Sequence, residues 1–383
     1  MVGVEVIGDM ELFARAVNDL PEHSRPKIVG VTGTNGKSTT TSLIGHILKK
    51  AGKDVRVGGN IGVGVLDMAP LHANAVYVLE LSSYQLDLME SLKCDVAVLL
   101  NITPDHLERH GGMQGYIDAK ARIFNNQSEK DLAVIGMDTM STQIMMAKMA
   151  ARKEHLTVGI SSQYALGRGV SVVRGRLFDS QSGRAMMVGD LNDVAALPGA
   201  HNHQNAAAAY AACRGLGIDP TIIMEAIESF PGLAHRQEVI GKIGDVTFVN
   251  DSKATNGQAA LQALKSYPRV YWIGGGVAKS DGLADVRPYF GHIAKAYLIG
   301  EAQNQFAREL GDEVAFSKCK TLDRAIAEAL HDAQNSGEHD PIVLLSPACA
   351  SFDQFKDFEA RGEEFRQLVF SLKDETERFK ATV

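Results

Sequence analysis

A strand-like segment that runs straight into a glycine loop and then into a helix constrains this chain most. The β-branched run Lys27 to Thr32 is followed by the loop Gly33 to Thr39, with the sequence GTNGKST, and then by apolar residues at helical spacing. Glycines let backbone N–H groups close around phosphate oxygens, and the amino end of a helix favours an anion. The sequence therefore predicts a nucleotide phosphate loop.

Two side chains of this loop have specific predicted contacts. Lys37 is placed to reach the β and γ phosphates of ATP, and Ser38 is placed to bind Mg²⁺. The spacing is shorter than the usual GxxxxGK[ST] pattern, because Val31 stands five residues before Gly36. A glycine turn that merely joins strand to helix is the structural alternative. The predicted ATP-binding residues of the loop are Gly33, Thr34, Asn35, Gly36, Lys37, Ser38 and Thr39.

The rest of the chain alternates short β-branched runs with helical patterns, which is typical of parallel sheets covered by helices. Between Leu156 and Leu191 the pattern changes to short polar-apolar strands, and we expect an antiparallel meander inserted at one edge. Phe230 to Leu233 is the best candidate for a domain hinge. The predicted buried strands are Lys27 to Thr32, Ala75 to Leu81, Val96 to Ile102, Val246 to Asn250, Val270 to Gly274, Ala296 to Gly300 and Ile342 to Ser346.

Composition excludes several functional classes. The chain has 46 acidic and 39 basic residues, a net charge of −7, and so lacks the basic surface expected for nucleic acid or an anionic membrane. Its four cysteines form no CxxC pair, which argues against a zinc site or a disulfide framework and favours the reducing cytoplasm. No apolar run approaches the length of a membrane span.

Two segments with acidic residues lie at the carboxyl ends of predicted buried strands. Glu80 lies at the end of one strand, and Thr103 to His106 follows another. Ligands bind at the carboxyl ends of parallel strands, and a carboxylate there suits Mg²⁺. For His106 taken alone, a structural hydrogen-bond donor and a metal ligand are equally good interpretations.

Lys120 lies on the apolar stripe of a predicted helix, together with Tyr116, Ile123 and Phe124. One interpretation is snorkelling, in which the stem packs and the ammonium reaches water. The other is chemical: burial near metal ions lowers the pKa of the lysine, and the neutral amine reacts with CO₂ to form a carbamate. A carbamate would supply oxygen ligands for a second Mg²⁺.

The second half of the chain holds polar groups with two interpretations each. Asn202 and Asn205 face the same way on a helix and suit adenine recognition, or they cap the helix. Arg236 beside the hinge suits a phosphate, and Asp251 at a strand end suits ribose hydroxyls, although isolated residues of this kind are mostly surface polar groups. Cys349 is interpreted as a small buried apolar residue, because no histidine partner is indicated.

The order of the motifs along the chain resembles the Mur ligase family, from about residue 3 to about residue 370. The motifs that carry the resemblance are GTNGKST, VLELSSYQL, NITPDHLERH, the pair Ala119-Lys120, HNHQN, AHR, NDSKATN, GGGVAKSD and SPACASFDQF. ELSSYQL, NDSKATN and SPACASFDQFKDFEARG are most similar to the members that add D-glutamate to UDP-N-acetylmuramoyl-L-alanine.

The resemblance implies a role for each matching residue. Lys37 would bind the ATP phosphates, and Lys120 would be the carbamylated lysine, with CO₂ as the source of the carbamate. Ser38, Glu80, His106 and Lys120 would hold Mg²⁺, and two ions are expected. Asn202 and Asn205 would lie near adenine, Arg236 on phosphate and Asp251 on ribose; catalysis would rest on Lys37, His106, Lys120 and Arg236. The substrate-binding residues would be Asn60 on the muramoyl side, Ser82, Ser83, His106, Lys253, Thr255, Lys279, Ser351, Phe352 and Phe358.

The resemblance also fixes an expected domain order. Family members begin with a further Rossmann-like domain that grips the UDP, and here only Gly3 to Phe13 is similar to its closing segment. Either the sequence is a truncation or the protein works without that domain. We expect a remnant of it at residues 1–22, a central ATP-binding domain at 23–232, and a Rossmann-like α/β domain at 233–383 that binds the amino acid and closes on the nucleotide.

The implied activity is an ATP-dependent, ADP-forming ligation of D-glutamate to UDP-N-acetylmuramoyl-L-alanine through an acyl phosphate. The expected protein is a cytoplasmic monomer with no nucleic-acid or membrane partner. Two alternatives remain: another ligase of Mur or folylpolyglutamate-synthase type acting on a different acid, and a nucleotide-binding module without ligase activity.

Overall fold

The computed structural model describes residues 5–152, 156–279 and 282–381. The chain divides into two compact units, Met1–Pro231 and Gly232–Val383. Each unit has one sheet with helices on both faces, so the predicted α/β class is confirmed. Parts of two predicted features, the segment from Gly3 and the end of the GGGVAKSD motif, lie outside the described residues.

Within its described residues, the first unit forms a nine-stranded sheet in the order β2-β3-β1-β4-β5-β6-β7-β8-β9. In this order every neighbouring pair from β2 through β7 is parallel, and the pairs β7–β8 and β8–β9 are antiparallel. The bounds are β1 (Lys27–Thr32), β2 (Asp54–Gly59), β3 (Ala75–Glu80), β4 (Val96–Leu99), β5 (Leu132–Gly136), β6 (Leu156–Ser161), β7 (Val170–Val173), β8 (Arg176–Asp179) and β9 (Met186–Asp190).

The predicted antiparallel insertion is confirmed at the edge of this sheet, but its first strand was assigned wrongly. β6 belongs to the parallel part, because helix α6 (Met140–Arg152) connects β5 to it. A strand that follows such a crossover returns parallel to the strand before it. The true insertion is therefore β7 to β9.

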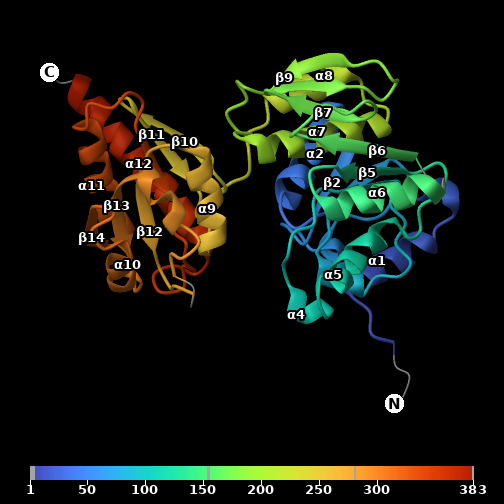
Figure 1. Ribbon diagram of the computed structural model, residues 1–383, viewed down its shortest axis with the longest axis horizontal. Helices are drawn as coiled ribbons and strands as arrows, with labels where there is room; N and C mark the ends of the chain where they lie inside the picture. The colour runs from blue at the N-terminus through green and yellow to red at the C-terminus, as the bar shows by residue number, and fades with distance from the viewer. Residues whose placement is uncertain (1–4, 153–155, 280–281, 382–383) are drawn as a thin grey trace. The chain divides into compact units, whose positions relative to one another are not determined.

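Helices cover both faces of the first sheet and bury an apolar core on each. One core packs α2, α7 and α8, and the other packs α1, α5 and α6. Figure 1 shows α7 above β5 and β6, and α1 and α5 below these two strands. The remaining bounds in this unit are α1 (Asp9–Asn18), η1 (Glu22–Ser24), α2 (Lys37–Lys50), η2 (Val65–Asp67), α3 (Ser83–Asp87), α4 (Leu107–His110), α5 (Met113–Ala121), η3 (Arg122–Phe124), α7 (Ala200–Gly215) and α8 (Pro220–Glu228).

The first helix, α1, is an integral part of the core of the first unit. Met10, Phe13, Ala14 and Val17 are buried at helical spacing, and the Phe13 ring lies 5.2 Å from that of Tyr77 on β3. The Glu11 carboxylate accepts hydrogen bonds from the backbone N–H groups of Glu90 and Ser91. This helix is therefore fixed to the sheet by both apolar and polar contacts.

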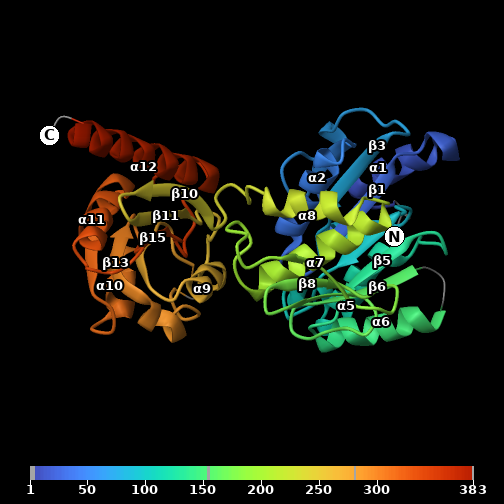
Figure 2. The same cartoon turned by 90° about the horizontal axis from the view of Figure 1, so that it is seen from above.

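The second unit has a six-stranded sheet among its described residues, in the order β10-β11-β15-β12-β13-β14. Only the β10–β11 pair is antiparallel. In Figure 2, α9 and α12 lie on opposite faces of this sheet. The bounds are β10 (Glu238–Ile243), β11 (Val246–Asn250), α9 (Gly257–Ser266), β12 (Val270–Gly275), η4 (Arg287–His292), β13 (Ile293–Ile299), α10 (Gln303–Leu310), β14 (Phe316–Lys320), α11 (Leu322–Gln334), β15 (Ile342–Leu345) and α12 (Phe358–Ala381).

The strand order decides which loops meet. In the first sheet β1 lies between β3 and β4, so the segments that follow these three strands share one edge. In the second sheet β15 lies between β11 and β12, so the segments that follow β11, β15 and β12 also share one edge. Carboxyl ends of parallel strands are where α/β folds bind ligands.

Across the described residues, no helix is both long and apolar enough to cross a membrane.

The packing of α1 can be tested by truncating one side chain. Phe13→Ala is expected to lower the free energy of unfolding of the first unit by about 3–4 kcal/mol, because it leaves a cavity against Tyr77. Leu12→Ala on the same helix, where the side chain is 48% exposed, should change it by less than about 0.5 kcal/mol. Urea unfolding measures both, and equal effects would contradict the packing described.

Candidate active site

The predicted phosphate loop joins β1 to α2, and its conformation depends on glycine. Gly36 has a φ of 85°, which side chains rarely adopt, and a Cβ there would lie 2.2 Å from Oδ1 of Asn205 on α7. The amino end of α2 begins at Lys37, whose Nζ donates to the carbonyls of Gly33 at 3.1 Å and Thr34 at 2.9 Å. Thr39 is buried in the first turn. The loop therefore presents a helix amino end and a lysine, as an anion site requires.

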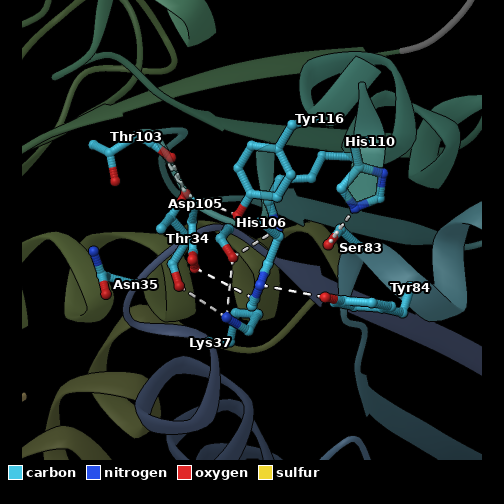
Figure 3. Close-up of polar contacts among 12 residues, drawn as sticks. Thr34, Asn35, Lys37, Ser83, Tyr84, Thr103, Asp105, His106, His110 and Tyr116 are labelled. Atoms are coloured by element: carbon cyan, nitrogen blue, oxygen red, sulfur yellow. Dashed lines mark hydrogen bonds and ion pairs between the residues drawn. The ribbon is translucent and has the colours of Figure 1, made fainter. Parts of the chain in front are cut away.

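The segment after β4 holds the loop from one side. The Thr34 N–H donates to the Asn101 carbonyl at 2.9 Å, and the Thr34 hydroxyl lies 3.1 Å from the Thr103 carbonyl. The Asn35 N–H donates to Asn101 Oδ1 at 2.9 Å. Figure 3 shows Thr34 and Asn35 beside Thr103 at this edge. The loop is therefore held by hydrogen bonds to a neighbouring strand end as well as by its own turn.

Lys120 lies directly beneath the loop and is only 1% exposed. Its Nζ donates to the Gly33 carbonyl at 2.9 Å, is 3.4 Å from Thr32 Oγ1, and lies 4.8 Å from the centre of the Tyr116 ring. Burial lowers the pKa of Lys120 to about 7, and the charge of Lys37 adds to the effect. A large fraction of Lys120 is therefore a neutral amine near neutral pH, and the snorkelling interpretation is wrong.

A group of histidines and tyrosines borders the loop on the side of α3, α4 and α5 (Figure 3). The Tyr116 hydroxyl lies 3.1 Å from Thr34 Oγ1, and His110 Nε2 lies 3.1 Å from the Ser83 hydroxyl. His106 is exposed, has a φ of 51°, and packs edge-on against Tyr84. Its ring nitrogens lie 3.4 Å from the Tyr84 hydroxyl and 3.5 Å from Asp105. This group brings His106 and Ser83 to the same edge as the loop.

Glu80 ends β3 on the other side of the loop. One carboxylate oxygen accepts a hydrogen bond from Asn60 Nδ2 at 2.8 Å, and the Asn60 N–H donates to the Glu80 carbonyl at 2.9 Å. The other oxygen, Oε2, is buried and has no hydrogen-bond partner within the described residues. Ser82 follows and caps α3 through a hydrogen bond from the Gln85 N–H. Asn60, Glu80 and Ser82 are thus gathered at one strand end.

The asparagine pair lies in the first turns of α7, next to the loop. Asn205 Nδ2 donates to Asn202 Oδ1 at 3.1 Å, and Asn202 Nδ2 donates to the Pro198 carbonyl at 2.9 Å. Both residues are buried. Asn205 is fixed against Gly36, so the pair and the phosphate loop form one continuous surface of the first unit.

In the second unit, Asp251 lies just after β11 and is only 4% exposed. Its carboxylate accepts from the Ser346 hydroxyl at 2.7 Å and from the Gln237 N–H at 3.1 Å. Burial raises the pKa of Asp251 to about 7, and the hydrogen bond from Ser346 and the charge of Arg236 oppose the rise. Arg236 and Asp251 therefore lie in one electrostatic group.

The other predicted residues of the second unit surround the same strand ends. Lys253 Nζ lies 5.7 Å from the centre of the Phe358 ring, and the Thr255 N–H donates to the Lys253 carbonyl. Val277 and Ala350 form a short bridge, which sets the segment of Lys279 beside that of Ser351. Ser351 is buried, Lys279 is exposed, and Phe352 is 74% exposed. The predicted positions thus gather at one edge, with Phe352 facing solvent.

Two family profiles match the chain. The one described as the Mur ligase middle domain matches residues 31–213, and the one described as Mur ligase, glutamate ligase domain, matches residues 235–349. A UDP-N-acetylmuramoylalanine--D-glutamate ligase of Caulobacter vibrioides is 57% identical over 97% of this chain and 78% of its own length. The protein of that name from Rhodospirillum rubrum is 51% identical over 97% of this chain and 76% of its own length.

The chain belongs to the Mur ligase family. Its fold agrees with two solved structures. A structure of UDP-N-acetylmuramoyl-L-alanyl-D-glutamate--2,6-diaminopimelate ligase matches with a TM-score of 0.65 and 20% identity, over 97% of this chain and 85% of the other. Escherichia coli FolC in complex with DHPP and ADP matches with a TM-score of 0.64 and 20% identity, over 96% and 95%. At this identity the likeness establishes the fold alone.

In this Mur ligase, the edge beside the loop has the chemistry that a magnesium site requires. Glu80 offers a buried oxygen that has no hydrogen-bond partner in the described part of the structure, and Ser38 offers a hydroxyl in the first turn of α2. Hard oxygen ligands of this kind suit Mg²⁺. No group of three His, Cys, Asp or Glu side chains that could hold a metal occurs in the described part of the chain. The residues therefore fit Mg²⁺ only as a set completed by other oxygen donors.

Several residues of the Mur ligase site were missed by the sequence reasoning. Asn101 opens the NITPDH motif, and its position directly after a buried strand was a usable signal. Tyr116 was placed on the apolar stripe only, although its hydroxyl reaches Thr34. Gln204 lies in the HNHQN motif and Ser346 opens SPACASFDQF, but neither was singled out, because their contacts join segments far apart in the sequence. Asp138 had no signal of its own.

The buried Lys120 makes stability depend on pH in a defined direction. Below pH 7 the native protein holds an ammonium that burial disfavours, so Lys120→Met should be more stable than the wild type. From pH 7 toward the ordinary lysine value of 10.5, the native amine is neutral while the unfolded one binds a proton, so the wild type gains stability. Between pH 6 and 9 the advantage of the variant should shrink by about 2–3 kcal/mol.

Urea unfolding in buffers free of CO₂ and divalent cations measures this difference. Lys130→Met, which changes an exposed lysine of the same unit, is the control and should show no such trend. A difference between Lys120→Met and the wild type that stays constant across this pH range would contradict the buried amine.

Proposed function

We propose that the protein is an ATP-dependent, ADP-forming ligase that joins D-glutamate to UDP-N-acetylmuramoyl-L-alanine during peptidoglycan precursor synthesis. The observation that supports it most is the phosphate loop with the buried Lys120 beneath it and the unpaired Glu80 oxygen at the same edge. The relatives that are 51% and 57% identical carry the name of that activity.

The proposed reaction has two steps. A carboxylate oxygen of the alanyl group attacks the γ phosphorus of ATP, the bond to the β–γ bridging oxygen breaks, and ADP leaves. The amine of D-glutamate then attacks the acyl carbon and loses a proton, and inorganic phosphate leaves as the amide forms. Catalysis of this kind rests mostly on positioning and on the neutralisation of phosphate charge.

The phosphate loop of the first unit would bind the triphosphate. Lys37 would turn from the Gly33 and Thr34 carbonyls to the β and γ phosphates, and the N–H groups of Gly33 to Thr39 would surround them. Asn202 and Asn205 would contact adenine, since they lie against the loop at Gly36. The hydrogen bonds of the loop to Asn101 mean that little reorganisation is needed on binding.

We place two Mg²⁺ ions at the edge beside the loop. Ser38, Glu80, His106 and a carbamate on Lys120 would hold them. Bound there, Mg²⁺ would neutralise charge on the phosphates and on the attacking carboxylate. The neutral Lys120 amine is the form that reacts with CO₂, losing a proton to give the carbamate, and its pKa of about 7 makes that form available.

The second unit would supply the remaining contacts. Arg236 would stabilise charge on the transferred phosphoryl group, and Asp251 would accept hydrogen bonds from ribose hydroxyls. D-Glutamate would bind beside the Lys253 ammonium, which suits a carboxylate. The other residues proposed for this pocket are Thr255, Lys279, Ser351, Phe352 and Phe358.

The muramoyl substrate would bind at the end of β3 in the first unit. Asn60 is held by Glu80, and Ser83 is held by His110, so these side chains are oriented in advance. Ser82 lies between them in sequence and caps α3. We also propose that the protein is a cytoplasmic monomer; its four free, buried cysteines suit a reducing compartment.

The proposed substrates can be tested by ADP release. With ATP, Mg²⁺ and UDP-N-acetylmuramoyl-L-alanine, D-glutamate should produce ADP, while L-glutamate and diaminopimelate should give at least about 100-fold less, since their amine or side chain is misplaced. If ATP binds but no combination of acyl substrate and amino acid releases ADP, the protein is a nucleotide-binding module and the proposal is wrong.

The proposed carbamate can be tested by chemical rescue. Lys120→Ala should lower kcat by at least about 100-fold, because it removes a metal ligand, and short carboxylic acids should restore part of the activity by occupying the place of the carbamate. Exposed Lys130→Ala, assayed with the same acids, is the control. Full activity of untreated Lys120→Ala would exclude the carbamate.

A further inference from the structure

Asn101 controls the backbone on both sides of Asn35 in the phosphate loop. The Asn35 N–H donates to Asn101 Oδ1 at 2.9 Å, and Asn101 Nδ2 donates to the Asn35 carbonyl at 3.2 Å. In a trans peptide the N–H and the carbonyl point in opposite directions. The Gly36 N–H, across the peptide from the Asn35 carbonyl, is therefore directed away from Asn101. The Thr34 carbonyl, on the other peptide, is directed to Lys37.

This arrangement requires one orientation of the Asn101 amide. If the amide were flipped, its NH₂ would face the Asn35 N–H and its oxygen would face the Asn35 carbonyl, so both hydrogen bonds would be lost. Gln204 on α7 supports the same orientation, because its Oε1 accepts from Asn101 Nδ2 at 3.3 Å. Gln204 is itself an amide with two possible orientations, so a further group must fix it.

Asp138, just after β5, fixes the orientation of the Gln204 amide. Gln204 Nε2 donates to Asp138 Oδ2 at 2.8 Å, and an ionised carboxylate only accepts hydrogen bonds. Asp138 is anchored by the Ser161 hydroxyl at 2.5 Å and the Ser162 N–H at 2.9 Å. The hydrogen bonds of Gln204 and Asn101 therefore agree in direction with an accepting carboxylate, Asp138, at one end and the backbone of Asn35 at the other.

The packing around Gln204 suits this connection. Gln204 is 6% exposed, so its amide depends on these protein partners. Gly136 at the end of β5 leaves the space: a Cβ there would lie 1.8 Å from the Leu100 carbonyl oxygen and 3.4 Å from Gln204 Nε2. The next residue on α7, Asn205, packs against Gly36 of the loop. The loop is thus held from β4, β5 and α7 together.

We propose that Asp138, Gln204 and Asn101 form a positioning relay that holds the phosphate loop in its anion-binding conformation and so sets the affinity for ATP. The proposal rests on the proposed function for the identity of the nucleotide. Asp138 and Gln204 act through Asn101, and Asn101 acts through the loop backbone. They are positioning residues, and their removal should raise KM for ATP more than it lowers kcat.

The first test removes the middle of the relay. Gln204→Met keeps the size of the side chain and removes both hydrogen bonds, so the Asn101 amide loses the partner on α7 that supports its orientation. The Kd for MgADP and for a non-hydrolysable ATP analogue, measured by calorimetry on the full chain, should rise about tenfold, which corresponds to about 1.4 kcal/mol. Asp138→Asn should also raise this Kd, because an amide can both donate and accept and so no longer fixes the orientation of the Gln204 amide.

A matched control separates this role from general destabilisation. Gln127 donates through Nε2 to the carbonyls of Cys94 and Leu132 at the opposite end of the sheet. Gln127→Met therefore removes the same chemical group and should lower the melting temperature without changing nucleotide affinity. In a double-mutant cycle, Asn101→Ala combined with Gln204→Met should weaken binding little more than Asn101→Ala alone, because the two residues act in series.

Nucleotide titrations of these variants decide whether Asp138, Gln204 and Asn101 act as a relay. An unchanged Kd in Gln204→Met, a loss no larger than in Gln127→Met, or fully additive effects with Asn101→Ala would each overturn the relay. The titration needs only the nucleotide, whereas ADP release needs the acyl substrate and D-glutamate. A wild type that binds nucleotide without releasing ADP would remove the proposed ligase activity, while the titrations would still decide the relay. A wild type that binds no nucleotide would overturn both.

Discussion

The candidate site of the first unit is built around one buried contact, between Lys120 Nζ and the Gly33 carbonyl of the phosphate loop. A lysine in such a place is unfavourable when charged, and the cost appears as a pKa of about 7. The same contact puts a nucleophilic amine beside Lys37 and near Glu80. Burial that disfavours a charged lysine thus keeps a neutral amine beside the loop.

The backbone carbonyl and N–H groups of the loop also take defined directions around this contact. The loop carbonyls of Gly33 and Thr34 face the two lysines, while the Asn101 amide faces the backbone of Asn35. A loop whose carbonyls point to cations on one side leaves its N–H groups to bind an anion on the other. Both arrangements arise at the carboxyl ends of β1, β3 and β4, because parallel strands bring these loops to one edge.

Much of this edge was predictable from the sequence, because the strands, the loop and the residues directly after them are local features. The positions of β1, β3 and β11 followed from β-branched runs. The place of Lys120 on an apolar stripe left snorkelling and burial open, and the structure shows the lysine buried. The parallel pairing of β6 was missed, since only the crossover through α6 reveals it. Contacts such as Gln204 with Asp138 depend on tertiary packing and leave no periodic signal.

The most direct test of the account is ¹³C NMR of the protein with ¹³C-labelled bicarbonate and Mg²⁺ near neutral pH. With Lys120 as a buried neutral amine beside the proposed Mg²⁺ ligands, one protein-bound carbamate signal is expected, and it should be absent from Lys120→Met. A wild type without such a signal, or a signal that persists in Lys120→Met, would contradict it.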